Sequence, residues 1–110
     1  MDFETKENRF YKLVNLLTTD QQDYIIPNGK IFLLEELGLN CNGNFNTRVD
    51  IVWDPNGINL ILLSSTGNST QKSQTQLIGD GSKILRIILT NNDSVNRILG
   101  GYNLGTVYGG

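Results

Sequence analysis

The tetrapeptide Asp-Pro-Asn-Gly at residues 54–57 lies between two apolar, β-branched runs, and it constrains the fold more than any other stretch of the chain. Proline presets φ at the first central position of a type I turn, asparagine tolerates the second, and glycine takes the positive φ that follows. The flanking residues 47–53 and 58–63 therefore predict a β-hairpin with a glycine bulge at its turn, and Trp53 stands beside that turn.

Strand-like runs recur every eight to fourteen residues along the chain, with turn residues between them. The first covers residues 11–19 and ends at a turn over residues 20–23. The chain also contains 14 asparagines and 12 glycines, which favour turns and compete with helix. Short strands at this spacing are typical of sandwiches and small barrels. We therefore predict an all-β, antiparallel β-sandwich, jelly-roll-like, of about seven to eight strands.

The 110 residues suit a single domain, because they are enough for one core and show neither a repeat nor a linker. Residues 1–10 show neither helical nor strand periodicity, so we expect an extended N-terminal arm ahead of a sandwich domain over residues 11–110; a short helix is the alternative. Residues 30–39 also stay open between two structures. Three leucines there fit one helix face, whereas Gly38 and the β surroundings favour a strand.

Charged residues are few and scattered. Nine Lys and Arg against eleven Asp and Glu give a net charge of −2, and no basic run exists. Nucleic acids and anionic membrane surfaces both require concentrated positive charge, so we expect neither as a partner. The N-terminus lacks the pattern of a signal peptide, and no apolar run approaches the ~20 residues of a membrane span. We therefore expect synthesis in a cytoplasm.

The chain contains no histidine and one cysteine, Cys41. This composition excludes Ser-His-Asp and Cys-His nucleophile systems, histidine-based metal sites and a zinc site, and no disulfide can form within the chain. Carboxylates offer no substitute, since Glu35 and Glu36 are adjacent and would point to opposite faces of a strand. We therefore expect no catalytic residues, no cofactor, no metal ion and no enzymatic activity.

Aromatic residues are the remaining candidates for contacts with other molecules. Phe3 and Phe10 in the arm, and Tyr102 and Tyr108 in the glycine-rich C-terminal stretch, are candidates for contact with a partner. Trp53 is a candidate for stacking on a sugar or a base, although a single tryptophan more often packs in a core or a hairpin.

Two segments resemble parts of a known kind of domain. Residues 24–37, YIIPNGKIFLLEEL, are similar to the strand-turn-strand opening of small jelly-roll sandwiches, and residues 77–93, LIGDGSKILRIILTNND, resemble a later strand of the same domains. The arrangement resembles virion structural proteins of tailed bacteriophages, including capsid decoration or cement proteins and small tail or fibre domains. This resemblance implies a location in the virion, self-association, commonly as a homotrimer, and attachment to a larger shell, such as a major capsid or tail protein.

Two functions follow from these observations. The first is a non-enzymatic structural protein, a phage capsid decoration protein that oligomerises and docks on a larger shell. The alternative is a carbohydrate- or receptor-binding module of a tail or fibre that uses Trp53, Tyr102 and a long loop over residues 64–75.

The two functions differ in solution. A structural protein that self-associates should scatter light as an oligomer, and a strict monomer with ordered termini would count against it. A carbohydrate-binding module should give hits on a glycan array, and Trp53→Ala should abolish them without changing the circular dichroism spectrum of the fold.

Overall fold

The computed structural model describes residues 2–41, 46–54, 56–57, 59–66 and 70–109, with the backbone alone for residues 2–8, 11, 40 and 41. Eight strands make up this part of the chain: β1 (Asp2–Val14), β2 (Thr18–Ile25), β3 (Ile31–Cys41), β4 (Thr47–Trp53), β5 (Leu60–Thr66), β6 (Thr70–Ile78), β7 (Ile84–Asn91) and β8 (Arg97–Gly109). These described ranges contain no helix, so the stretch 30–39 is the strand that its glycine and its surroundings favoured.

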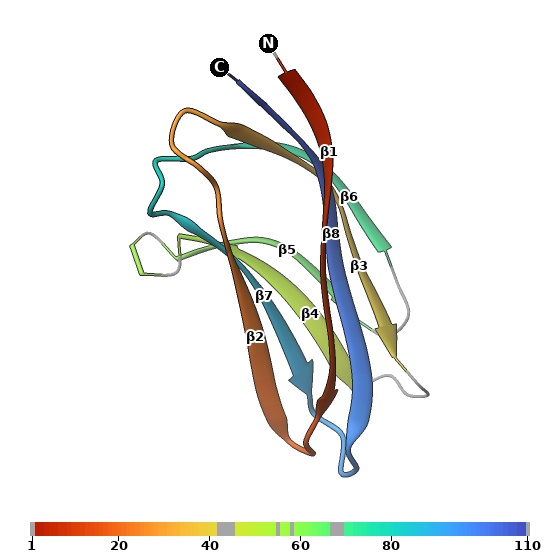
Figure 1. Ribbon diagram of the computed structural model, residues 1–110. Helices are drawn as coiled ribbons and strands as arrows, with labels where there is room; N and C mark the ends of the chain where they lie inside the picture. The colour runs from red at the N-terminus through yellow and green to blue at the C-terminus, as the bar shows by residue number, and fades with distance from the viewer. Residues whose placement is uncertain (1, 42–45, 55, 58, 67–69, 110) are drawn as a thin grey trace.

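The strands form two four-stranded sheets, in the orders β1-β8-β3-β6 and β2-β7-β4-β5 (Figure 1). The first strand pairs with the eighth, the second with the seventh, the third with the sixth and the fourth with the fifth, all antiparallel. The chain is thus one long hairpin wrapped into two layers, which is the jelly-roll arrangement. The predicted all-β, antiparallel sandwich is confirmed.

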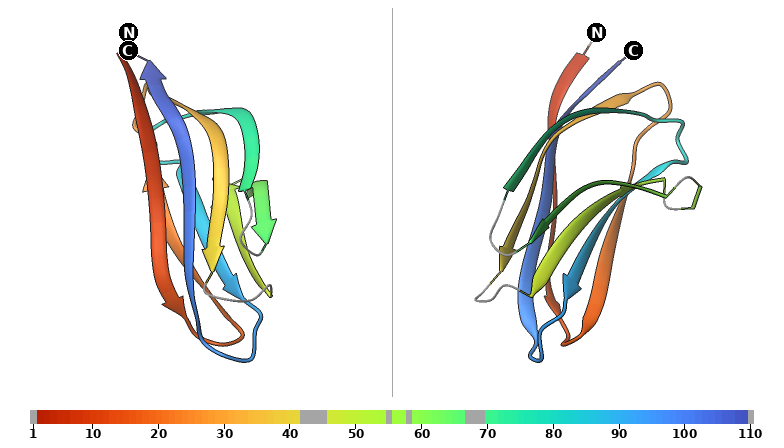
Figure 2. Two further views of the ribbon diagram at one scale, coloured as in Figure 1. Left: turned by 90° about the vertical axis from the view of Figure 1, so that its right-hand side faces the viewer. Right: turned by 180° about the vertical axis from the view of Figure 1, so that it is seen from behind.

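The core lies between the two layers and follows from strand alternation. Every second residue of β7 is buried, and these residues face the inward side chains of β3 and β8. The buried apolar residues are Val14, Ile26, Phe32, Leu34, Leu37, Leu39, Val49, Ile51, Val52, Trp53, Leu77, Leu85, Ile87, Leu89 and Leu99. The two termini lie together at one end of the molecule, opposite the β1–β2 and β7–β8 turns (Figure 2).

The hairpin around residues 54–57 exists, but its backbone differs from the prediction. The amides of Gly57 and Asn59 donate to the Asp54 carbonyl at 3.0 and 2.8 Å. Positive φ falls on Asp54 (50°) and Asn59 (53°), not on Gly57. A Cβ at position 57 would lie 2.3 Å from the Asp54 carboxylate, which is the end of a side chain that can move aside. The bulge is in β5 itself, where the register passes over Leu62.

The N-terminal half of the chain also departs from the expected boundaries. β1 pairs with β8 without interruption from Asp2 to Val14, so the predicted division between residues 10 and 11 falls inside one strand. β8 is long enough to pair with β1 over this whole length. The first turn lies at Leu16 and Leu17, not at residues 20–23, which belong to β2.

Gly101 provides a test of the packing between the layers. A Cβ on this residue would lie 2.8 Å from Leu89 Cδ2 and 3.0 Å from Val49 Cγ2, both in the other sheet. We expect Gly101→Val to overfill the core and lower the free energy of unfolding by about 1–3 kcal/mol, measured by urea denaturation. Ile98→Val, at an exposed position of the same strand, is the control and should change it by less than about 0.5 kcal/mol. Equal urea midpoints for the two variants would contradict the packing described here.

Candidate interaction surfaces

A row of aromatic and charged side chains crosses the outer face of the β1-β8-β3-β6 sheet. The guanidinium of Arg9 on β1 lies 5.7 Å from the ring centroid of Tyr102 on β8. The Tyr102 hydroxyl donates to Glu36 Oε2 on β3 at 2.7 Å, and Lys72 Nζ on β6 donates to Glu36 Oε1. The row therefore ties together all four strands of this sheet.

Gly38 allows Tyr102 to lie across β3. The two residues are opposite each other in the β3–β8 register, and a Cβ at position 38 would come within 2.2 Å of the Tyr102 ring. The glycine that interrupts the helical pattern in the sequence therefore has a packing role on this outer face.

The charges in the row stabilise one another. The hydrogen bond from Lys72, followed by the one from Tyr102, lowers the pKa of Glu36 from its ordinary 4.5. The Glu36 carboxylate in turn raises the pKa of Lys72 and, through its hydrogen bond, the pKa of Tyr102. At neutral pH the three groups keep their ordinary charge states. The row is thus a cross-strand tie and not a pair poised for proton transfer.

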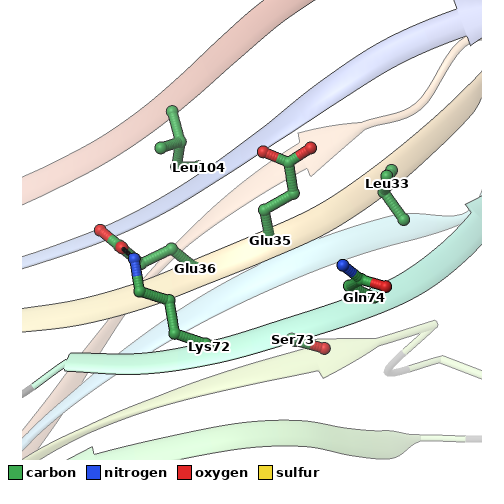
Figure 3. Close-up of a pocket in the computed structure, with 7 residues that line it drawn as sticks. All are labelled: Leu33, Glu35, Glu36, Lys72, Ser73, Gln74 and Leu104. Carbon is green, nitrogen blue, oxygen red and sulfur yellow. Dashed lines mark hydrogen bonds and ion pairs between the residues drawn. The ribbon is translucent and has the colours of Figure 1, made fainter.

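A shallow depression adjoins this row where β3 bulges at Glu35 (Figure 3). It has a volume of about 530 Å³ and is lined by Leu33, Glu35, Glu36, Lys72, Ser73, Gln74 and Leu104. The Thr106 hydroxyl donates to Glu35 Oε1 at 3.1 Å beside it. These seven lining side chains include no nucleophile paired with a base. Within the described residues, no group of three or more His, Cys, Asp or Glu is placed to hold a metal ion.

The predicted partner-contact residues are divided between the two faces of this sheet. Tyr102 and Tyr108 are half-buried on the outer face, where the Tyr108 hydroxyl accepts a hydrogen bond from Gln76 Nε2 at 2.7 Å. Phe3 is opposite Tyr108 in the register, and its side chain is outside the described part of the structure. Phe10 packs against the core instead. Of the predicted partner-contact residues whose side chains are described, Tyr102 and Tyr108 therefore lie on the outer face.

The ligand-stacking hypothesis for Trp53 is wrong. The side chain is 6% exposed and belongs to the central core cluster. Alternation along β4 directs residues 47, 49, 51 and 53 inward, so the indole ring faces the other layer and offers no face to a sugar.

An exposed apolar group that the sequence patterns did not indicate lies at one end of the sandwich. We call it the apolar tip. Its five side chains come from the β1–β2 and β7–β8 turns and the strand ends beside them, and they are 40–67% exposed: Leu13, Leu16, Leu17, Val95 and Ile98. The sequence did contain one signal for this group, the pair Leu16-Leu17 next to Asn15. Because apolar residues flank the pair, the segment was predicted to be a strand.

Comparisons with known proteins establish the fold and no family. No family model matches the chain, and no match is found among curated proteins. A structure from the disulfide-linked pili formed by Bacillus endospore appendages matches 97% of this chain and 88% of its own, with a TM-score of 0.53 and 12% identity. The Drosophila NLP core, described for pentamer formation and histone binding, matches 92% of this chain and 95% of its own, with a TM-score of 0.45 and 7% identity. The pilus structure thus shares the fold with this chain. The described residues contain no helix that could span a membrane.

The Glu36 tie generates a pH prediction. Because the pKa of Glu36 is lowered on folding, its contribution to stability is present above the pKa of the unfolded chain and is lost as the pH falls through the folded value. We expect the urea midpoint of the wild type to exceed that of Glu36→Gln at neutral pH, and this difference to shrink as the pH falls below 4.5.

Two further variants check the assignment. Lys72→Met removes the first partner of Glu36 and should reproduce the smaller pH dependence. Gln74→Ala, at an exposed position of the same strand, should keep the wild-type pH profile. A difference between wild type and Glu36→Gln that stays constant with pH would contradict the tie.

Proposed function

We propose that this chain is a non-enzymatic structural subunit whose copies associate with one another. The observation that carries the proposal is its exposed apolar surface. Single exposed apolar residues are normal on a soluble protein, but a group of five at one end marks an interaction site. Nine large apolar side chains of the described residues are at least 40% exposed: Leu13, Leu16, Leu17, Ile25, Leu60, Ile61, Ile78, Val95 and Ile98.

A second apolar surface lies on β5. Of the described strands, β1, β2, β5 and β6 are at the sheet edges, and natural proteins usually protect such edges with charges. β5 carries no charged residue, and its Leu60 and Ile61 are 50% and 56% exposed. The bulge at Leu62 interrupts continuous strand addition, so this edge is suited to contact through side chains.

The fold comparison supports a structural role. The Bacillus appendage protein, which has this fold over nearly the whole chain, forms pili that are linked by disulfides. These 110 residues contain one cysteine, and one thiol can join two copies but cannot extend a polymer. Association of this chain would therefore depend on non-covalent contacts.

The sequence resemblance implies a more specific function, which stays a prediction. In that function the chain is a phage capsid decoration protein that forms a trimer and docks on a major capsid or tail protein in the virion. Its support in the fold is architectural, because jelly rolls are common in viral capsids. Trp53 cannot serve as the stacking residue of the carbohydrate-binding alternative, because its side chain is buried.

Self-association can be measured by analytical ultracentrifugation over a concentration series, with negative-stain electron microscopy of the concentrated samples. We expect larger species that persist at about 1 M salt, where charge interactions are screened but apolar burial is not. Ile61→Lys should shift the equilibrium toward smaller species, because it places a charge in the β5 surface. Gln22→Lys, which adds the same charge at an exposed position in the middle of β2, should not. A monomer at every concentration would contradict the proposal.

A further inference from the structure

The tripeptide Pro-Asn-Gly occurs twice in this chain, at residues 27–29 and at residues 55–57. The asparagine and the glycine of both copies lie in turns and are exposed. When glycine follows asparagine, its backbone nitrogen can attack the asparagine side-chain amide with little steric hindrance, because glycine has no Cβ. The reacting groups are identical in the two copies, so their surroundings decide which of them reacts.

The backbone amide of Gly29, in the first copy, is open to reaction. One backbone hydrogen bond closes this turn, in which the Lys30 amide donates to the Pro27 carbonyl at 3.1 Å. Gly29 has a φ of 80°, as the third residue of a type II turn does, and its own amide has no acceptor in the part of the chain that the structure describes. No other part of the chain comes within 4 Å of the place that a Cβ of Gly29 would take, so this residue can rotate without a clash.

The corresponding amide of Gly57, in the second copy, is held inside its turn. It donates to the Asp54 carbonyl at 3.0 Å, and the Asn59 amide donates to the same carbonyl at 2.8 Å. The Asp54 carboxylate also lies beside Gly57, 2.3 Å from the place of a Cβ. The nitrogen must lose its proton before it can attack, and an N–H that donates a hydrogen bond next to a negative charge loses its proton less readily.

The charge near Gly29 has the opposite sign. Lys30 follows it in the sequence, and the Lys30 Nζ donates to the Gly109 carbonyl at 3.3 Å. Gly109 in turn lies against the Gly29 carbonyl, whose oxygen is 2.7 Å from the place that a Cβ of Gly109 would take. The ammonium group is therefore held close to this turn, where it favours the negative charge that the Gly29 nitrogen gains when it loses its proton.

We propose that Asn28 is a site of spontaneous covalent modification and that the fold protects Asn56 from the same reaction. The Gly29 nitrogen gives its proton to hydroxide and attacks the Asn28 Cγ. A new C–N bond closes a succinimide ring, the bond from Cγ to the side-chain nitrogen breaks, and that nitrogen takes a proton from water and leaves as ammonia. Water then opens the ring in one of two ways. Cleavage of the bond from Cγ to nitrogen gives aspartate, and cleavage of the bond from the backbone carbonyl carbon to nitrogen gives isoaspartate.

The modification changes a turn that joins the two sheets. The Lys30 carbonyl accepts the Gly79 amide at 2.8 Å, and the Ile26 carbonyl accepts the Gly81 amide at 3.3 Å, so the β2–β3 connection is bonded to the β6–β7 connection (Figure 1). Aspartate keeps the backbone length, whereas isoaspartate adds a methylene group to the backbone before Gly29 and shifts Lys30 relative to its partners. Isoaspartate should therefore weaken this junction. The inference does not depend on the self-association proposed above.

Peptide mapping by mass spectrometry tests the site, and the second tripeptide is its internal control. The folded chain is kept in mildly alkaline buffer, and samples taken over time are digested in acid, where cyclisation is slow. Asn28 should convert at least about five-fold faster than Asn56, because only the second turn retains the amide proton in a hydrogen bond. Electron-transfer fragmentation should find both aspartate and isoaspartate at position 28. In guanidinium chloride, which unfolds the chain, the two asparagines should convert at similar rates.

Conversion of Asn56 that equals or exceeds that of Asn28 in the folded chain would overturn the proposal. So would a folded chain that stays intact at Asn28 while the unfolded chain reacts, or a difference between the two sites that persists in guanidinium chloride.

Variants provide the second measurement. Asn28→Ser should abolish the acidic species that accumulates on ion-exchange chromatography, and the matched variant Asn56→Ser should leave it unchanged. The isoaspartate form of the aged wild type should unfold at a lower urea concentration than Asn28→Asp, which carries the same charge without the added methylene. Equal urea midpoints for these two forms would overturn the effect on the junction between the sheets.

Discussion

The backbone pairing of β8 with both β1 and β3 organises the whole fold. It bonds to β1 on one side and to β3 on the other along most of its length, while its inward residues face the second layer. A glycine at position 101 allows β8 to lie this close to the second layer, because Leu89 and Val49 occupy the space that a side chain would fill. The outer row around Tyr102 and the apolar tip each include a residue of β8, Tyr102 in the row and Ile98 in the tip.

These two surfaces have opposite physical character. In the row from Arg9 to Lys72, charged and hydroxyl groups bond to one another: Glu36 accepts from both Lys72 and Tyr102. The apolar tip leaves five large side chains in contact with water, and Asn91 Nδ2 joins its two turns by donating to the Val14 and Val95 carbonyls. Apolar surface that is organised but unburied is the feature of this molecule most directly relieved by association.

Turn chemistry and strand spacing were sufficient to predict the architecture. The Asp-Pro-Asn-Gly segment did mark a hairpin, and Gly38 did mark β3 as a strand. The same local reasoning failed at Leu16-Leu17, because an apolar pair within a turn cannot be told from strand by periodicity. It also left Trp53 open as a ligand contact, since an alternating pattern does not say which face meets the other layer.

Composition and turn residues indicate an all-β chain without histidine chemistry, because they act locally and leave few alternatives. The residues that meet across the fold can be identified from the folded chain alone. Leu16 and Asn96 are 80 positions apart, and Glu36 and Tyr102 are 66 apart, yet each pair is joined by a hydrogen bond. Contacts of this kind depend on strand order and register. These are properties of the whole folded chain and cannot be inferred from any single segment.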